Sequence, residues 1–427
     1  MSRAVWLVAV VLGAAGCSGR AAEAEPPPDP PQVHPAGPVV QASAGLESDL
    51  AATHAFSEGR PRFEQPLADG LTVPSGTPSL SAQDCGACHP AIQAEWATSA
   101  HAHAWRDAQY QAEITKSGNQ WLCLNCHTPL LAQQARWPVG LQAGDVELPV
   151  LVENPVFDAD LRDEGITCAA CHVRDGTIHG PGLPDSTAPH PVVADDTFMT
   201  TQVCERCHQA VAVYPGKDFV CTFDTGNEWR AGPHAPEQGC ADCHMPTVQR
   251  PAAVGGPVRT VRQHWWRGAG IPKVAGVLQP VAANPPGLGL QATWQADTLV
   301  LVLTNARAGH LLPTGDPERW VQVDVAFMDA SGAPVGEPWQ ARIGQRWEWW
   351  PEPKKLGDDR LAPGQSRTEE LVVPGGAVAA RVTASSHRMT AEAAGYHDLD
   401  DYPLSVVTHR LRVTPDGATG GRVEDPL

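Results

Sequence analysis

Five copies of the pattern Cys-x-x-Cys-His are the residues of this 427-residue sequence whose types and spacing could do chemistry. Two thiols two residues apart can bond to both vinyl groups on one porphyrin edge, and the His that follows can ligate the iron. Chance would give about 0.01 such patterns in a chain of this composition. The sequence therefore predicts five covalently bound c-type haems.

Each motif assigns two cysteines to covalent attachment and one histidine to the proximal side of an iron. The attachment residues are Cys85, Cys88, Cys123, Cys126, Cys168, Cys171, Cys204, Cys207, Cys240 and Cys243, and the proximal ligands are His89, His127, His172, His208 and His244. A zinc ribbon and a disulfide framework also use paired cysteines. Neither explains why a His follows every second Cys, so both alternatives are disfavoured.

The ligand on the opposite face of each iron decides the function. An iron held by two histidines transfers electrons, whereas an open face can bind a small molecule and react. The candidates for this second ligand are His101, His179, His190, His234, His264 and His310. His103 is an alternative to His101, and His387, His397 and His409 are expected at the surface. Because they suffice for five irons, the count favours electron transfer.

The N-terminus predicts export, which c-type haem attachment requires. Residues Ala4–Ala15 are apolar but too short to span a bilayer, and they lead into Ala-Gly-Cys17, which resembles a bacterial lipobox. Cys17 would then be lipidated, and Ser18 after it favours the outer membrane over the inner one. The alternative is an ordinary signal peptide cleaved near Ala14–Gly16. Cys221, outside all of these patterns, is expected to be a buried and inert thiol.

Composition and periodicity divide the chain into six segments. They are a signal peptide (1–17), a Pro- and Ala-rich disordered tether (18–79), a pentahaem domain (80–268), a linker (269–289), a β-sandwich (290–414) and a frayed tail (415–427). The pentahaem domain is expected to be mostly α, with a helix over Pro90–Trp105 and haem plates replacing an ordinary core. Alternating runs such as Thr298–Thr304 and Val321–Phe327 predict an antiparallel sandwich.

The net charge of −18 disfavours nucleic acid and anionic membrane surfaces as partners. It favours steering toward a basic redox protein, such as a basic cytochrome, or transfer with a membrane quinol oxidase system. The predicted location is the periplasm, with a lipid anchor in the outer membrane. No other segment contains eighteen consecutive apolar residues, so no membrane-spanning helix is expected.

Several motifs resemble the multihaem cytochromes c related to the tetrahaem cytochrome of ammonia oxidisers, hydroxylamine oxidoreductase, pentahaem nitrite reductase and octahaem tetrathionate reductase. The resemblance lies in Trp96-x-x-Ser-x-His101, Gly165–His172 and Cys240–Pro246, and it spans Ser81–Trp266. It implies a mostly helical, haem-packed domain with closely stacked haem pairs. The segment Gly309–Gly315 is similar to one in β domains that follow such haem domains.

Two departures weaken the catalytic members of this group as guides. Pentahaem nitrite reductases commonly have Lys in place of one motif His, whereas all five motifs here end in His. Hydroxylamine oxidoreductase crosslinks a Tyr to its catalytic haem, and no Tyr here has a recognisable setting. The sequence therefore predicts a pentahaem electron carrier. The alternatives are a reductase or oxidoreductase of a small nitrogen or sulfur compound at one five-coordinate haem, and an adhesive β module.

Overall fold

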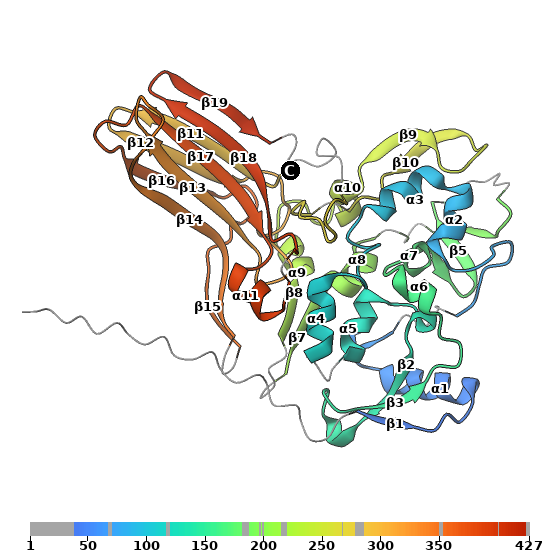
Figure 1. Ribbon diagram of the computed structural model, residues 1–427. Helices are drawn as coiled ribbons and strands as arrows, with labels where there is room; N and C mark the ends of the chain where they lie inside the picture. The colour runs from blue at the N-terminus through green and yellow to red at the C-terminus, as the bar shows by residue number, and fades with distance from the viewer. Residues whose placement is uncertain are drawn as a thin grey trace, which may run out of the picture. The chain divides into compact units, whose positions relative to one another are not determined.

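Short helices that carry the Cys-x-x-Cys-His motifs occupy the N-terminal part of the chain, and two antiparallel sheets form the C-terminal part (Figure 1). The computed structural model describes residues 38–66, 71–116, 120–181, 188–195, 198, 200–214, 220–266, 268–277, 286–349, 353–399 and 401–423. The predicted signal peptide, Cys17 and the tether up to Gly37 lie outside these residues. Within them, no helix is long and apolar enough to cross a membrane.

Every motif sits on a helix of one or two turns, which places both cysteines on the same helical element and the His at or just after its end. These helices are α2 (Ala82–Cys88), α5 (Gln120–His127), α7 (Cys168–His172), α8 (Thr201–His208) and α10 (Cys240–His244). The Ser81 hydroxyl caps α2 by accepting the backbone N–H of Gln83. Pro90 starts α3 (Pro90–Ala97), which ends well before the predicted Trp105, where a turn replaces the helix.

The expectation of a mostly α haem domain is not supported, because strands pair between its helices; over all described residues, the sandwich included, strands hold 35% and helices 25%. The segments between motifs are short and rich in β-branched residues, so they pair as small sheets. These sheets contain β1 (Val39–Gln41), β3 (Pro149–Glu153) and β2 (Arg136–Leu141); β4 (Val173–Arg174), β5 (Thr177–Gly180) and β6 (Val192–Ala194); β7 (Gln209–Val213) and β8 (Val220–Asp224); and β9 (Thr247–Pro251) and β10 (Val258–Arg262). The remaining helices are α1 (Leu46–Ser57), α4 (Ala108–Lys116), α6 (Ala159–Asp163), α9 (Thr225–Arg230) and α11 (Ala391–Tyr396), with 3₁₀ turns at Arg62–Glu64, Leu131–Gln133 and Gln142–Gly144.

The predicted disordered tether is also wrong from residue 38 onward. Strand β1 pairs in parallel with β3, and α1 follows it. Leu50 packs against the cluster that contains the fully buried Trp137, and Phe56 meets the edge of Trp121 at 5.6 Å between ring centroids. Asp49, Thr53 and Ser57 of α1 are buried as well, so the segment packs onto the haem domain although few of its side chains are apolar.

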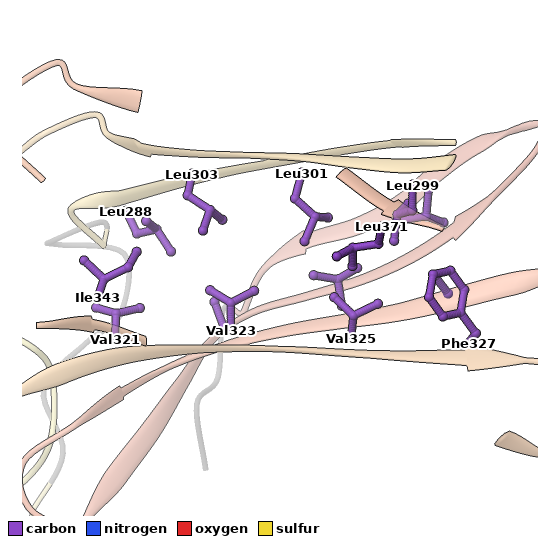
Figure 2. Packing of buried hydrophobic residues seen from close by; sticks show 14 of the residues in the cluster. Leu288, Leu299, Leu301, Leu303, Val321, Val323, Val325, Phe327, Ile343 and Leu371 are labelled. Carbon is purple, nitrogen blue, oxygen red and sulfur yellow. The ribbon is translucent and has the colours of Figure 1, made fainter. Parts of the chain in front are cut away.

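The C-terminal sandwich has sheets of order β11-β12-β16 and β15-β14-β13-β17-β18-β19. Its strands are β11 (Leu288–Gln295), β12 (Thr298–Asn305), β13 (Trp320–Met328), β14 (Pro334–Glu348), β15 (Lys354–Asp358), β16 (Ser366–Val372), β17 (Ala379–His387), β18 (Ser405–Thr414) and β19 (Gly417–Arg422). Figure 2 shows alternate residues of β12, Leu299, Leu301 and Leu303, facing the valines of β13. The predicted frayed tail is wrong up to Arg422, because β19 pairs with β18, and residues 424–427 lie outside the described residues.

Candidate haem-binding site

Cysteines from different motifs touch one another, and these contacts give the spatial order of the motifs. The side chains of Cys168 and Cys85 are hydrogen-bonded to each other, which joins the third motif to the first. The contact of Cys204 with Cys240 joins the fourth motif to the fifth. A side-chain hydrogen bond between Cys207 and Cys126 joins the fourth motif to the second. Cys171 of the third motif also interacts electrostatically with Cys204 and Cys207 of the fourth. The fourth motif therefore adjoins the second, third and fifth, and it is the branch point of the set.

Four motif histidines face a second histidine at nearly constant separation. The ring centroids lie 6.5 Å apart for His89 and His190, 6.3 Å for His101 and His208, 6.3 Å for His172 and His264, and 6.2 Å for His244 and His310. Two metal–nitrogen bonds of about 2 Å and two centre-to-nitrogen distances of about 1 Å place imidazoles on opposite faces of one iron about 6 Å apart. Each pair could therefore hold an iron between its rings.

Hydrogen bonds at Nδ1 fix the orientation of many of these imidazoles. The Nδ1 atoms of His89, His127 and His172 lie 2.7, 2.7 and 2.9 Å from the backbone oxygens of Ala252, Ala104 and His179, respectively. Among the facing histidines, Nδ1 of His264 lies 3.0 Å from the oxygen of Arg262, and Nδ1 of His310 lies 2.9 Å from that of Leu311. An Nδ1–H that donates to a carbonyl leaves Nε2 as the metal-binding nitrogen.

Burial keeps three of the paired imidazoles neutral. Burial, with repulsion from neighbouring histidines, lowers the pKa of His101 to about 3, that of His208 to about 4 and that of His264 to about 3. A neutral imidazole is the form that ligates a metal. These side chains are therefore in the binding form at neutral pH without a proton having to leave.

Close backbone approaches position two of the facing histidines. Gly165 has φ +64° and passes so near His101 that a Cβ would lie 2.7 Å from its backbone oxygen. That same oxygen accepts the N–H of Ile166 at 3.0 Å. On the other side, a Cβ on Gly76, which has φ +79°, would overlap the backbone oxygen of Pro189, next to His190. Only glycine fits at these two positions without displacing the histidine-bearing loops.

The sandwich itself supplies one facing histidine. His310 lies in the loop after β12, and the side-chain amide of Asn305, which is 1% exposed, donates to its backbone oxygen at 2.9 Å. A Cβ on Gly232 would lie 2.4 Å from the backbone oxygen of Gly309, so this loop rests directly on the segment before the fifth motif. His234 packs on Gly309 instead of facing a motif histidine.

His127 differs from the other four motif histidines. Among the described residues, no second imidazole faces it. Its ring instead stacks on Tyr110, with centroids 3.8 Å apart and planes 5° from parallel. The Tyr110 hydroxyl is buried without a hydrogen-bond partner. Trp105 meets Tyr110 edge to face, with ring centroids 5.9 Å apart. No local pattern indicates that Tyr110 stacks on a motif histidine, because α4 carries no motif.

The other candidate histidines have partners of other kinds. His179 places Nδ1 3.0 Å from a carboxylate oxygen of Asp195, while its backbone oxygen orients His172. His103 lies 3.1 Å from the backbone oxygen of Ala97, so it does not substitute for His101. His387, His397 and His409 contact Ser385, Glu113 and Thr408, respectively. The predicted set of six therefore divides into four that face motif histidines and two, His179 and His234, that do not. Cys221, expected to be buried, has its pKa raised mainly by burial.

A buried ion pair holds the segment of His264. Arg250 on β9 donates to both carboxylate oxygens of Glu95, at 2.6 and 2.7 Å, and the carboxylate also accepts the backbone N–H of His264 at 2.9 Å. The Glu95 side chain is 8% exposed and that of Arg250 is 19% exposed. Sequence reasoning missed this pair, because its partners are far apart in the chain.

We predict that Glu95→Gln destabilises the protein by about 2–4 kcal/mol, because it leaves the Arg250 cation without a counter-charge in a buried site. Guanidinium unfolding followed by circular dichroism would measure the change. The matched control is Glu153→Gln, whose ion pair with Arg136 is about half exposed at both partners, and its effect should be below about 1 kcal/mol. Equal effects of the two variants would contradict a positioning role for Glu95.

The residues fit c-type haem. Each motif offers two thiols on one helix and an adjacent imidazole, and four motifs face a second imidazole at the separation that an iron requires. In the described residues, no group of three or more His, Cys, Asp or Glu side chains is arranged to hold a metal ion by itself. The paired imidazoles suit an iron that is held by a porphyrin and two axial nitrogens.

Comparisons with known proteins agree with this chemistry. Residues 84–144 match the family described as cytochrome c554 and c-prime. A penta-heme cytochrome c552 from Thermochromatium tepidum has a similar structure, with a TM-score of 0.56 and 18% identity over 82% of this chain and 100% of that chain. No curated protein matches the sequence. The family match and the motifs support a multihaem c-type cytochrome, and the structural likeness shows that the fold recurs across most of the chain.

Proposed function

We propose that this protein transfers electrons through five c-type haems, four of which are ligated by two histidines. The observation that carries the proposal is the constant 6.2–6.5 Å separation of four histidine pairs that come from distant parts of the chain. Bound haem would supply a one-electron iron couple at each motif. The chain's own residues fix the axial imidazoles, exclude water from them and set the order in which the motifs adjoin.

The cysteine contacts support a branched path. Electrons would pass from the first motif to the third and then to the fourth, which adjoins both the second and the fifth. Arg206, in the fourth motif, lies in the same neighbourhood, because its pKa is lowered mainly by burial and is influenced by Cys207 and Cys126. A branch would let one entry point serve two exits, or two entry points serve one exit.

A second candidate function is chemistry at the motif of His127. It rests on the absence of a second imidazole opposite this ring within the described residues. An iron there would keep one open coordination position, where a small nitrogen or sulfur compound could bind. Carbon monoxide titration of the reduced protein distinguishes the functions. One molecule bound per chain favours an open iron at His127, and none bound favours electron transfer alone.

We further propose a periplasmic protein anchored to the outer membrane through lipidated Cys17, with a basic redox protein as partner. The net charge of −18 supports this choice of partner.

The proposed electron-transfer function is tested by making the protein with the cytochrome c maturation system. Intact mass should show five added haems, and a potentiometric titration should take up five electrons per chain. A protein that gains no haem, or that exchanges no electrons, would contradict the proposed function.

A further inference from the structure

Trp266 lies between the facing histidines of two different motifs. Its indole meets His101 at 4.7 Å between ring centroids with planes 63° apart, and His264 at 5.1 Å with planes 90° apart. His101 faces the fourth motif and His264 faces the third. One side chain therefore contacts the candidate second iron ligands of two haem sites, those of the third and the fourth motif. Edge-to-face contacts of this kind have preferred orientations, so they restrict ring rotation.

We propose that Trp266 is a positioning residue that sets the orientation of both imidazoles, and so links the third and fourth haem sites. This inference rests on the proposed function, because it assumes that His101 and His264 ligate iron. The inference goes beyond the proposed ligation, because Trp266 contacts both ligands and is not itself a ligand.

The indole also packs against a buried cluster that includes a motif cysteine. Trp266 belongs to a cluster with the buried Trp96 and Ala102, and this cluster also includes Cys168 of the third motif. The Trp96 indole N–H in turn donates to the backbone oxygen of Ile166 at 2.8 Å. The indole therefore contacts His101 and His264 and packs against the same buried cluster as Cys168.

The backbone of Trp266 is strained in a way that secondary structure does not explain. Its φ is +40°, a left-handed conformation that bulky side chains rarely adopt. Such strain persists only where surrounding contacts over-determine it, and it gathers at functional sites. A glycine would adopt this φ freely, yet it would remove the ring that contacts both histidines. The strained backbone therefore supports a role for the Trp266 side chain at this position.

Electron paramagnetic resonance of the oxidised holoprotein can test this role. In low-spin ferric haem the largest g value depends on the angle between the two axial imidazole planes. The planes of the facing pairs here differ by 57° at the fourth motif and 27° at the third, against 38° at the first and 13° at the fifth. The four sites should therefore give distinguishable signals.

In Trp266→Leu we expect the signals of the third and fourth motifs to shift together, while the other two stay in place. Trp266→Phe keeps an aromatic edge, so it should shift the same two signals by less, and it serves if the Leu variant does not fold. The control is Trp294→Leu, since Trp294 contacts Phe327 in the sandwich and should move no signal.

Unchanged signals in both Trp266 variants, or a shift at only one site, would overturn the inference while leaving the proposed function intact. If the unaltered protein lacked low-spin signals of bis-imidazole haem, the proposed ligation would fail, and this inference would fail with it.

Discussion

Replacing His310 by Ala is expected to convert one low-spin haem per chain to the high-spin state, because it removes the ring that faces His244. The two imidazoles lie 6.2 Å apart with planes only 13° from parallel. Alanine offers no ligand, so the iron would become five-coordinate or would bind water. Electron paramagnetic resonance should show one additional high-spin haem, and the reduced variant should bind one more carbon monoxide than the unaltered protein.

Two further variants make this result specific. His234 packs on Gly309, so it is the nearest substitute ligand, and His234→Ala combined with His310→Ala should give the same spectrum as the single variant. His387→Ala is the matched control, because its ring stacks on Trp320 within the same sandwich and it should leave all spin states unchanged. A low-spin spectrum identical to that of the unaltered protein in the double variant would show that the sandwich does not ligate the fifth haem.

Replacing Lys273 by Met is expected to destabilise the protein by about 3–5 kcal/mol, because it leaves a buried carboxylate without its cation. Lys273 contacts Asp107, which is 2% exposed and also accepts the hydroxyl hydrogen of Tyr402. Burial opposes ionisation of Asp107, but Lys273 and Tyr402 together hold its pKa below the usual range. Arg388 lies over the Tyr402 ring at 4.4 Å and donates to the backbone oxygen of Ile271.

This network joins the haem domain, the linker and the sandwich, so its loss should also weaken the hold on His310. We expect guanidinium unfolding of Lys273→Met to begin at lower denaturant, with a high-spin signal appearing before the helices are lost. Lys355→Met is the control, because Lys355 is 41% exposed and its pair with Asp358 should contribute below about 1 kcal/mol. If both variants unfold alike, the network does not couple the two parts.

The sequence alone predicts the attachment residues, because the motif is local. Covalent attachment needs two thiols and an imidazole within five successive positions, so nothing about the fold had to be known. The facing histidines were only partly predictable. His101, His190, His264 and His310 face motif histidines, but His179 and His234 have equally plausible sequence settings and do not. Loop residues of this kind are placed by contacts such as those of Gly76 and Gly165, which leave no local pattern.

Other features depend on contacts between distant segments. The exposed hairpins between motifs, such as β9–β10, are not predicted from the sequence, because porphyrin packing is expected there to replace ordinary secondary structure. Residues from 38 onward look disordered by composition, yet Leu50 and Phe56 of α1 pack against buried residues of the haem domain. Trp266 and Glu95 acquire their roles only through partners that are remote in sequence. The sandwich strands were easier, since their two-residue alternation reports burial directly.

Quantitative electron paramagnetic resonance of the fully oxidised holoprotein tests the account most directly, because it counts irons by their axial ligands. Four low-spin haems and one high-spin haem per chain are predicted, with the high-spin signal altered in Tyr110→Leu, since Tyr110 stacks on His127. Two or more high-spin haems, or five low-spin haems, would contradict the assignment of four facing pairs and one unfaced motif histidine.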